Sequence, residues 1–219
     1  MNFECSRLII ARKKRGLTQK ALANLLGLTP RHFNSYEVGE HIPPESVLNQ
    51  IANTLNFPVG FFDGEELESI SSDFVSFRAM SKMTAKMRDQ ALASASLATM
   101  ASDWISEKFN LPDSDLPDLR GMDPETAAES LRNEWGLGDK PIANLIHLLE
   151  SKGIRVFSLT TEPLEIDAFC FWRKDVPYIF LNINKSSERT RFDGAHELGH
   201  LVLHRHGEPH GRQAELEAD

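Results

Sequence analysis

Apolar residues at the start of this chain recur at helical spacing in short blocks, and each block is bounded by residues that begin or end helices. Four helices are predicted in the first 55 residues, at 7–15, 19–26, 30–37 and about 43–55. A threonine precedes the second and third blocks, where its hydroxyl can cap a helix, and a glycine follows each of the first three. The pattern predicts a bundle of short helices.

Helical spacing continues along the chain and then gives way to β-rich runs. Longer helices are predicted at 84–109, 123–135 and 141–152. Three runs rich in β-branched and aromatic residues predict a small, partly antiparallel sheet, at 154–159, 168–172 and 177–182. A last helix is predicted to begin near Glu188.

These elements predict an α+β fold that is mostly α. We expect a five-helix domain at 1–64, an acidic linker and the long helix at 65–122, and a domain with a three-stranded sheet at 123–219. With 219 residues, 41% of them hydrophobic, the chain is long enough to form one large or two small cores.

Composition excludes several classes of protein. The sequence has no run of 18 apolar residues, so we expect no membrane-spanning helix. The first residues lack a basic region followed by an apolar core, which a secretion signal needs. Cys5 and Cys170 are too few for a disulfide framework in a chain of this size. We therefore expect a cytoplasmic protein that does not interact with membranes.

Charge is distributed unevenly between the two ends of the chain. Residues 1–64 hold 7 Lys/Arg and 5 Asp/Glu, a net charge of +2, and residues 65–219 hold 17 and 27, a net charge of −10. Within residues 1–36 the basic residues outnumber the acidic ones by 7 to 1. This local basic region is a weak indication of nucleic-acid binding.

The second and third predicted helices, joined by a tight turn with a glycine, form a helix-turn-helix. Over residues 5–62 the sequence resembles the lambda-repressor-like (XRE) family. The matching frame consists of Leu17, Thr18, Gln19, Leu22, Ala23, Gly27, Leu28, Thr29, Tyr36, Glu37, Gly39 and Pro43. The resemblance implies binding to double-stranded DNA, and it implies a homodimer because two half-sites need two copies of the domain.

In such a fold the third helix enters the major groove. Arg31 is then the candidate for a guanine contact, and Asn34 for an adenine contact. The predicted DNA contacts are Gln19, Thr29, Pro30, Arg31, Asn34 and Ser35. Cations expected beside phosphates are Arg12, Lys13, Lys14, Arg15 and Lys20. The alternative is a four-helix protein-binding module with a solvated basic face.

His196, Glu197 and His200 form the pattern H-E-x-x-H on the last predicted helix. Residues four apart share a helical face, so both imidazoles can bind one metal ion, with Glu197 beside it as general base for a bound water. Chance would produce this pattern roughly 0.02 times in a chain of this composition. The alternative is a helix with surface histidines, but the surrounding leucines predict a buried helix, where two histidines need partners.

From about residue 123 the chain resembles the ImmA/IrrE-type metallopeptidases, a family of minimal gluzincins. The resemblance rests on residues 177–182, 191–204 and 215–219. It implies that His196 and His200 bind Zn²⁺ and that Glu197 is the catalytic acid/base. It also implies that the strand at 177–182 is a sheet edge on which a peptide substrate lies, at Tyr178, Ile179 and Phe180.

A catalytic zinc needs three protein ligands, and the resemblance places the third in the Glu-x-Glu-Ala-Asp frame at 215–219. Glu215 and Glu217 are about 200° apart around a helix, so only one can face the metal. Glu217 is favoured because it directly precedes Ala-Asp, Glu215 is the alternative, and Asp219 is expected behind the ligands.

The last predicted helix, at the C-terminus, has no Gly or Pro to end it, so we expect a truncated chain with an incomplete metal site. Substitute ligands would then be His204, His206 or His210.

The sequence predicts a DNA-binding regulator whose second domain is a zinc-dependent endopeptidase. The relatives of this kind imply a repressor, or another partner protein, as the substrate. The alternative is a non-proteolytic transcription factor or antitoxin-like regulator whose zincin domain only senses a ligand or partner.

Overall fold

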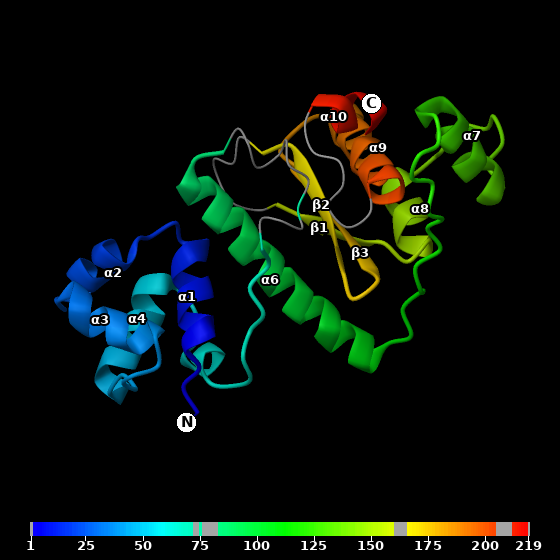
Figure 1. The fold of residues 1–219 in the computed structure, drawn as a ribbon. Helices are drawn as coiled ribbons and strands as arrows, with labels where there is room; N and C mark the ends of the chain where they lie inside the picture. The colour runs from blue at the N-terminus through cyan, green and yellow to red at the C-terminus, as the bar shows by residue number, and fades with distance from the viewer. Residues whose placement is uncertain (1, 72–74, 76–82, 160–165, 205–211, 219) are drawn as a thin grey trace. The chain divides into compact units, whose positions relative to one another are not determined.

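The computed structural model describes residues 2–71, 75, 83–159, 166–204 and 212–218 (Figure 1). The chain divides into two compact units, which are described separately. The first comprises residues 1–70 and 84–101, and the second comprises residues 71–83 and 102–219. The long helix α6 (Ala85–Lys108) contributes residues to both.

The first unit begins with four α-helices and one short 3₁₀ helix, as the sequence predicts. They are α1 (Cys5–Lys14), α2 (Gln19–Leu25), α3 (Pro30–Glu37), α4 (Glu45–Leu55) and η1 (Val59–Phe62). Thr18 and Thr29 are the caps of α2 and α3, because their hydroxyls accept hydrogen bonds from the amides of Ala21 and His32 at 3.1 and 3.2 Å.

The core of this bundle consists of large side chains that are almost completely buried. They include Leu8, Phe33, Tyr36, Ile51, Leu55 and Phe62. A smaller cluster joins Ile10 of α1 to Leu67 and to Ala93 of α6. Leu67 and Ile70 are only 7% and 6% exposed, so this part of the expected acidic linker packs into the unit. The sequence pattern did not indicate this because acidic and serine residues surround these two apolar side chains.

A buried ion pair lies beside this core and corrects one expectation. Arg12 was expected beside DNA phosphates, but it is 7% exposed, and its guanidinium donates two hydrogen bonds to Glu37, at 2.5 and 3.0 Å. It also donates to the carbonyl oxygen of Leu17 at 2.7 Å. Arg12 therefore ties α1 to the end of α3. The sequence could not show this because a basic residue on a predicted helix has no visible partner 25 residues away.

The second unit contains the sheet, in the order β1–β3–β2. The strands are β1 (Arg155–Ser158), β2 (Ala168–Arg173) and β3 (Val176–Leu181). β3 pairs antiparallel with β2, and Cys170 lies opposite Ile179 in this pairing. On its other side β3 pairs parallel with β1, where Val156 lies opposite Ile179. The predicted α+β class, mostly α with a small partly antiparallel sheet, is confirmed.

The position of β3 overturns the expected substrate edge. Tyr178, Ile179 and Phe180 lie in the middle strand, and their backbone groups are paired on both sides. The edge strands are β1 and β2, and Val75 forms an isolated antiparallel bridge with Phe171 on β2. The sequence showed three strands but not that the first would return, parallel, to the far side of the third.

The two faces of the sheet are different. One face carries stacked aromatic rings, with centroids 4.7 to 6.4 Å apart, from Phe157, Phe169, Phe171, Tyr178 and Phe180. The other face contributes Cys170, Ile179 and Leu181 to the main core.

Three helices complete that main core. They are α7 (Pro124–Glu134), α8 (Leu145–Ser151) and α9 (Ser187–Leu203). Helix α8 begins four residues after the predicted start because Asn144 caps it, accepting from the amide of His147 at 3.1 Å. A short helix, α10 (Arg212–Ala218), follows α9. Among the described residues, no helix has the length and apolar character needed to cross a membrane.

We predict that Arg12→Ala lowers the free energy of unfolding by about 3–5 kcal/mol, because it leaves Glu37 buried without its cation. The matched control is Arg31→Ala, which removes an exposed arginine from α3 and should change stability by no more than about 0.5 kcal/mol. Urea unfolding followed by far-ultraviolet circular dichroism measures both. Equal stability of the two variants would show that the buried ion pair does not support the fold.

Candidate metal centre and nucleic-acid surface

Helix α9 places the two histidines of the H-E-x-x-H pattern one turn apart. Ser186 caps the helix, its hydroxyl accepting from the amide of Arg189 at 3.3 Å. The helix then runs for 17 residues to Leu203, with His196 in its second half and His200 in its last turn. On the sheet side, the indole of Trp172 donates to the carbonyl oxygen of Leu201 at 3.2 Å, which links β2 directly to α9.

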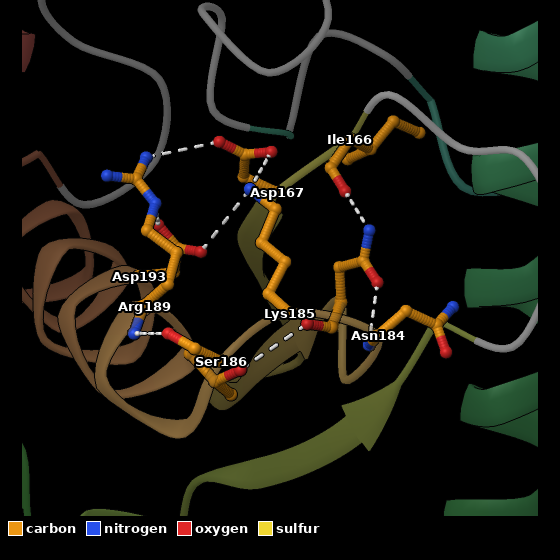
Figure 2. A network of polar contacts seen from close by, with 9 residues as sticks. Ile166, Asp167, Asn184, Lys185, Ser186, Arg189 and Asp193 are labelled. Carbon is orange, nitrogen blue, oxygen red and sulfur yellow. Dashed lines mark hydrogen bonds and ion pairs between the residues drawn. The ribbon is translucent and has the colours of Figure 1, made fainter.

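A network of ion pairs holds the first turns of α9 to the start of β2 (Figure 2). Arg189 contacts Asp167 and Asp193, each at 3.1 Å, and Lys185 pairs with Asp167. Burial raises the pKa of Asp193, which the nearby Arg189 and Lys185 only partly offset. For Asp167 burial also raises the pKa, but hydrogen bonds from the same two cations outweigh it and lower the pKa overall. This network fixes the direction in which α9 leaves the sheet.

Three side chains converge beyond this network, one from α10 and two from α9. The Nε2 atoms of His196 and His200 are 3.2 Å apart. The carboxylate of Glu215 lies 3.5 Å from His196 Nε2 and 3.7 Å from His200 Nε2. One ligand atom from each residue lies within 4.8 Å of the others, and His200 and Glu215 are buried.

These separations fit a tetrahedral zinc ion. With zinc about 2.0–2.1 Å from each ligand, tetrahedral geometry places ligand atoms about 3.4 Å apart. The three observed distances lie within a few tenths of an ångström of that value. Two imidazoles and one carboxylate are also the donor set of catalytic zinc sites that leave a position for water.

In the structure Glu215, the alternative third ligand, lies beside His196 and His200. Glu217 instead contacts His204. Glu217 Oε2 lies 3.0 Å from Nε2 of His204, on the other side of α10. The sequence frame alone could not decide between the two acids, because the choice depends on how α10 is rotated against α9. Asp219, His206 and His210, also considered from the sequence, lie outside the described residues.

Close packing at a glycine lets α10 reach the histidines. A Cβ atom at Gly199 would lie 3.1 Å from both the Cα atom and the carbonyl oxygen of Ala218. These backbone atoms cannot move away as a flexible side chain can. The absence of a side chain at Gly199 therefore sets the approach of α10, and with it the position of Glu215.

Glu197 is 4% exposed and lies next to His196 in the sequence, facing β2. Its neighbour there is Cys170, whose pKa is raised well above the usual value by burial and by the negative charges of Glu197 and Glu215. The thiol therefore stays protonated and is a hydrogen-bond donor to Glu197 rather than a thiolate ligand. In the sequence Cys170 is an isolated cysteine, and nothing there pairs it with Glu197.

In the first unit, the exposed part of α3 is narrower than predicted. Thr29, Pro30 and Arg31 are exposed at its start. Ser35 was expected to contact bases, but it is 7% exposed, and its hydroxyl donates to the carbonyl oxygen of His32 at 2.7 Å. Its position, five residues after the first residue of α3, turns it toward the core.

Gln19 and Asn34 are connected to the buried ion pair of Arg12 and Glu37 by hydrogen bonds. The amide of Gln19 donates to Glu37 at 2.5 Å and to Asn34 at 3.1 Å. This places both amides beside the start of α3 and fixes their orientation. Both residues stay partly exposed, so they remain predicted DNA contacts.

Most of the cations that were expected to contact phosphates form ion pairs or hydrogen bonds with other residues of the first unit. Lys13 pairs with Asp89 at 3.1 Å, and Lys14, whose pKa is lowered by burial, donates to Ser94 at 2.8 Å. Arg15 donates to the carbonyl oxygens of Leu55 and Asn56 and lies over the ring of Phe57. The exposed cations of this group are Lys20 and Arg15, with Arg31 on α3.

Comparison with known proteins finds two family matches, in separate parts of the chain. Residues 8–62 match the family described as helix-turn-helix, and residues 149–219 match the family described as IrrE N-terminal-like domain. Neither the curated proteins nor the solved structures include a significant match. The resemblances inferred from the sequence are therefore confirmed at the level of domains: a DNA-binding regulator domain precedes a peptidase-like domain.

We predict that Gly199→Ala weakens zinc binding about tenfold, although alanine favours a helix, because the new Cβ pushes α10 and Glu215 away. The matched control is Gly194→Ala in the same helix, where the new Cβ would meet the movable end of Leu145 at 3.3 Å. Competition with a fluorescent zinc chelator measures both affinities. If the two variants bind zinc equally well, the spacing of α9 and α10 does not control the site.

Proposed function

We propose that this chain, which joins a helix-turn-helix domain to an IrrE-like domain, is a DNA-binding regulator with zinc-dependent endopeptidase activity toward a repressor or other partner protein. The observation that carries the proposal is the convergence of His196, His200 and Glu215 at the spacing of zinc ligands. Glu197, which is 4% exposed and directly follows His196 in the sequence, is the residue to which we assign the role of general base.

Bound zinc would supply a water of lowered pKa and stabilise the charge that develops on the scissile carbonyl oxygen. The residues of this chain perform the proton transfers. Glu197 takes the proton of the attacking water and returns it to the nitrogen of the departing amine. The protonated thiol of Cys170 keeps the Glu197 carboxylate in place by donating to it, and takes no part in the chemistry.

We assign the peptide substrate to the outer edge of β2 rather than to β3. A peptide can add only to a strand whose backbone groups are unpaired on one side, and β3 is paired on both. β2 is an edge strand and is linked to α9 through Trp172. An isolated antiparallel bridge between Val75 and Phe171 pairs this edge at one position, and we propose the same antiparallel direction for a peptide along β2.

The metal content of the purified chain tests the proposal. We predict about one zinc per chain by elemental analysis, and loss of that zinc in His196→Ala and Glu215→Ala, which each remove a ligand. Glu197→Gln is the control: it should keep zinc but lose hydrolysis of a proteome-derived peptide library analysed by mass spectrometry. A chain that holds zinc and cleaves no peptide would instead support a sensor, and cleavage by Glu197→Gln would exclude the proposed base.

For the first domain, we propose that Arg31 reads a base and that Lys20 contacts phosphate, and that the chain binds its operator as a homodimer. Arg31→Ala should lower the affinity for the preferred site about 10- to 100-fold, with little effect on unrelated DNA. Lys20→Ala should weaken binding to all sequences alike and reduce the salt dependence.

Fluorescence anisotropy measures both variants on sites selected from a random-sequence library. Equal binding of Arg31→Ala and the unaltered chain to every sequence would refute the role of Arg31. Sedimentation of the complex checks its stoichiometry, and a single copy on the selected site would refute the dimer.

A further inference from the structure

A third histidine continues the stripe formed by His196 and His200. His204 follows α9 directly, four residues after His200, and its side chain is only 7% exposed. Its Nδ1 atom lies 3.1 Å from Nδ1 of His200, and its Nε2 atom lies 3.0 Å from Oε2 of Glu217. Both ring nitrogens of His204 are therefore engaged, one with the proposed zinc ligand and one with α10.

These contacts allow one arrangement of protons when His200 binds zinc through Nε2, as the proposed function requires. The Nδ1 atom of His200 then carries the hydrogen of the neutral ring. It donates to Nδ1 of His204, which must present a lone pair, so neutral His204 carries its own hydrogen on Nε2. That hydrogen is donated to the carboxylate of Glu217, which can only accept.

We propose that His204 and Glu217 are positioning residues that fix the ring and the tautomer of His200 for metal binding. A ligating histidine usually donates its second N–H directly to a carboxylate, carbonyl or water. Here a second histidine stands between the ligand and the carboxylate. The arrangement extends the hydrogen-bonded path from His200 to α10.

The geometry separates this role from that of a metal ligand. The ligand cluster is formed by Nε2 atoms and a Glu215 oxygen, whereas His204 faces the opposite nitrogen of His200. Glu215 and Glu217 lie about 200° apart around α10. One short helix therefore supplies a proposed ligand beside Nε2 of His200 and, on its other side, the carboxylate of Glu217, which is linked to Nδ1 of His200 through His204.

The proposal rests on the proposed zinc site, and zinc affinity of the full chain is the first measurement. His204→Phe keeps a ring but removes both hydrogen bonds, and should weaken zinc binding about 10- to 100-fold. His204→Asn is the matched variant, because its side-chain oxygen can take the place of Nδ1 and accept from His200. It should restore most of the lost affinity, and Glu217→Ala should show an intermediate loss.

A second measurement reports the tautomer itself. In nitrogen-15 spectra of histidine-labelled, zinc-loaded protein, His200 of the unaltered chain should show a hydrogen on Nδ1 that exchanges slowly with water. That hydrogen should exchange rapidly in His204→Phe and slowly in His204→Asn. Far-ultraviolet circular dichroism confirms that each variant is folded.

The outcomes separate this inference from the proposed function. If the unaltered chain binds no zinc, the proposed function fails and this role for His204 fails with it. If the unaltered chain binds zinc and His204→Phe binds it equally well, with unchanged exchange at His200, only the positioning role is overturned. Equal losses in His204→Phe and His204→Asn would also overturn it, because ring packing rather than hydrogen bonding would then explain the effect.

Discussion

The candidate metal centre depends on the close contact of two helices. α9 supplies two histidines through its own periodicity, but the third candidate ligand, Glu215, comes from α10, and its position is set where Ala218 passes over Gly199. A backbone contact of this kind is stiffer than a side-chain contact, since a displaced atom moves the whole helix with it. The ion pairs of Asp167 and Asp193 fix the other end of α9. The two histidines therefore lie on a helix that is held at its start by these ion pairs and near its end by the contact between Gly199 and Ala218.

The parts of this structure that follow from local chemistry could be predicted from the sequence. Thr18 and Thr29 cap helices because the next residues carry a helical pattern, and His196 and His200 share a face because helices have 3.6 residues per turn. The match of both domains to known families follows from the same local motifs. Such features need only a few consecutive residues to be determined.

The parts that could not be predicted depend on contacts between distant segments. β3 is the central strand because β1 pairs with it across a crossover, and this cannot be read from the strand itself. Glu215 rather than Glu217 faces the histidines because of the rotation of α10. Arg12 is part of the core because Glu37 lies opposite it. In each case the residue type was recognised, but its partner was not.

The position of Trp172 allows helix α9 to be followed by fluorescence. The three tryptophans of the chain, at 104, 135 and 172, all belong to the second unit, so tryptophan fluorescence reports on that unit alone. The indole of Trp172 is bonded to Leu201, the residue directly after the second histidine of the pattern. The chain therefore carries its own optical reporter of the helix that bears the two histidines, and no label has to be attached to observe it.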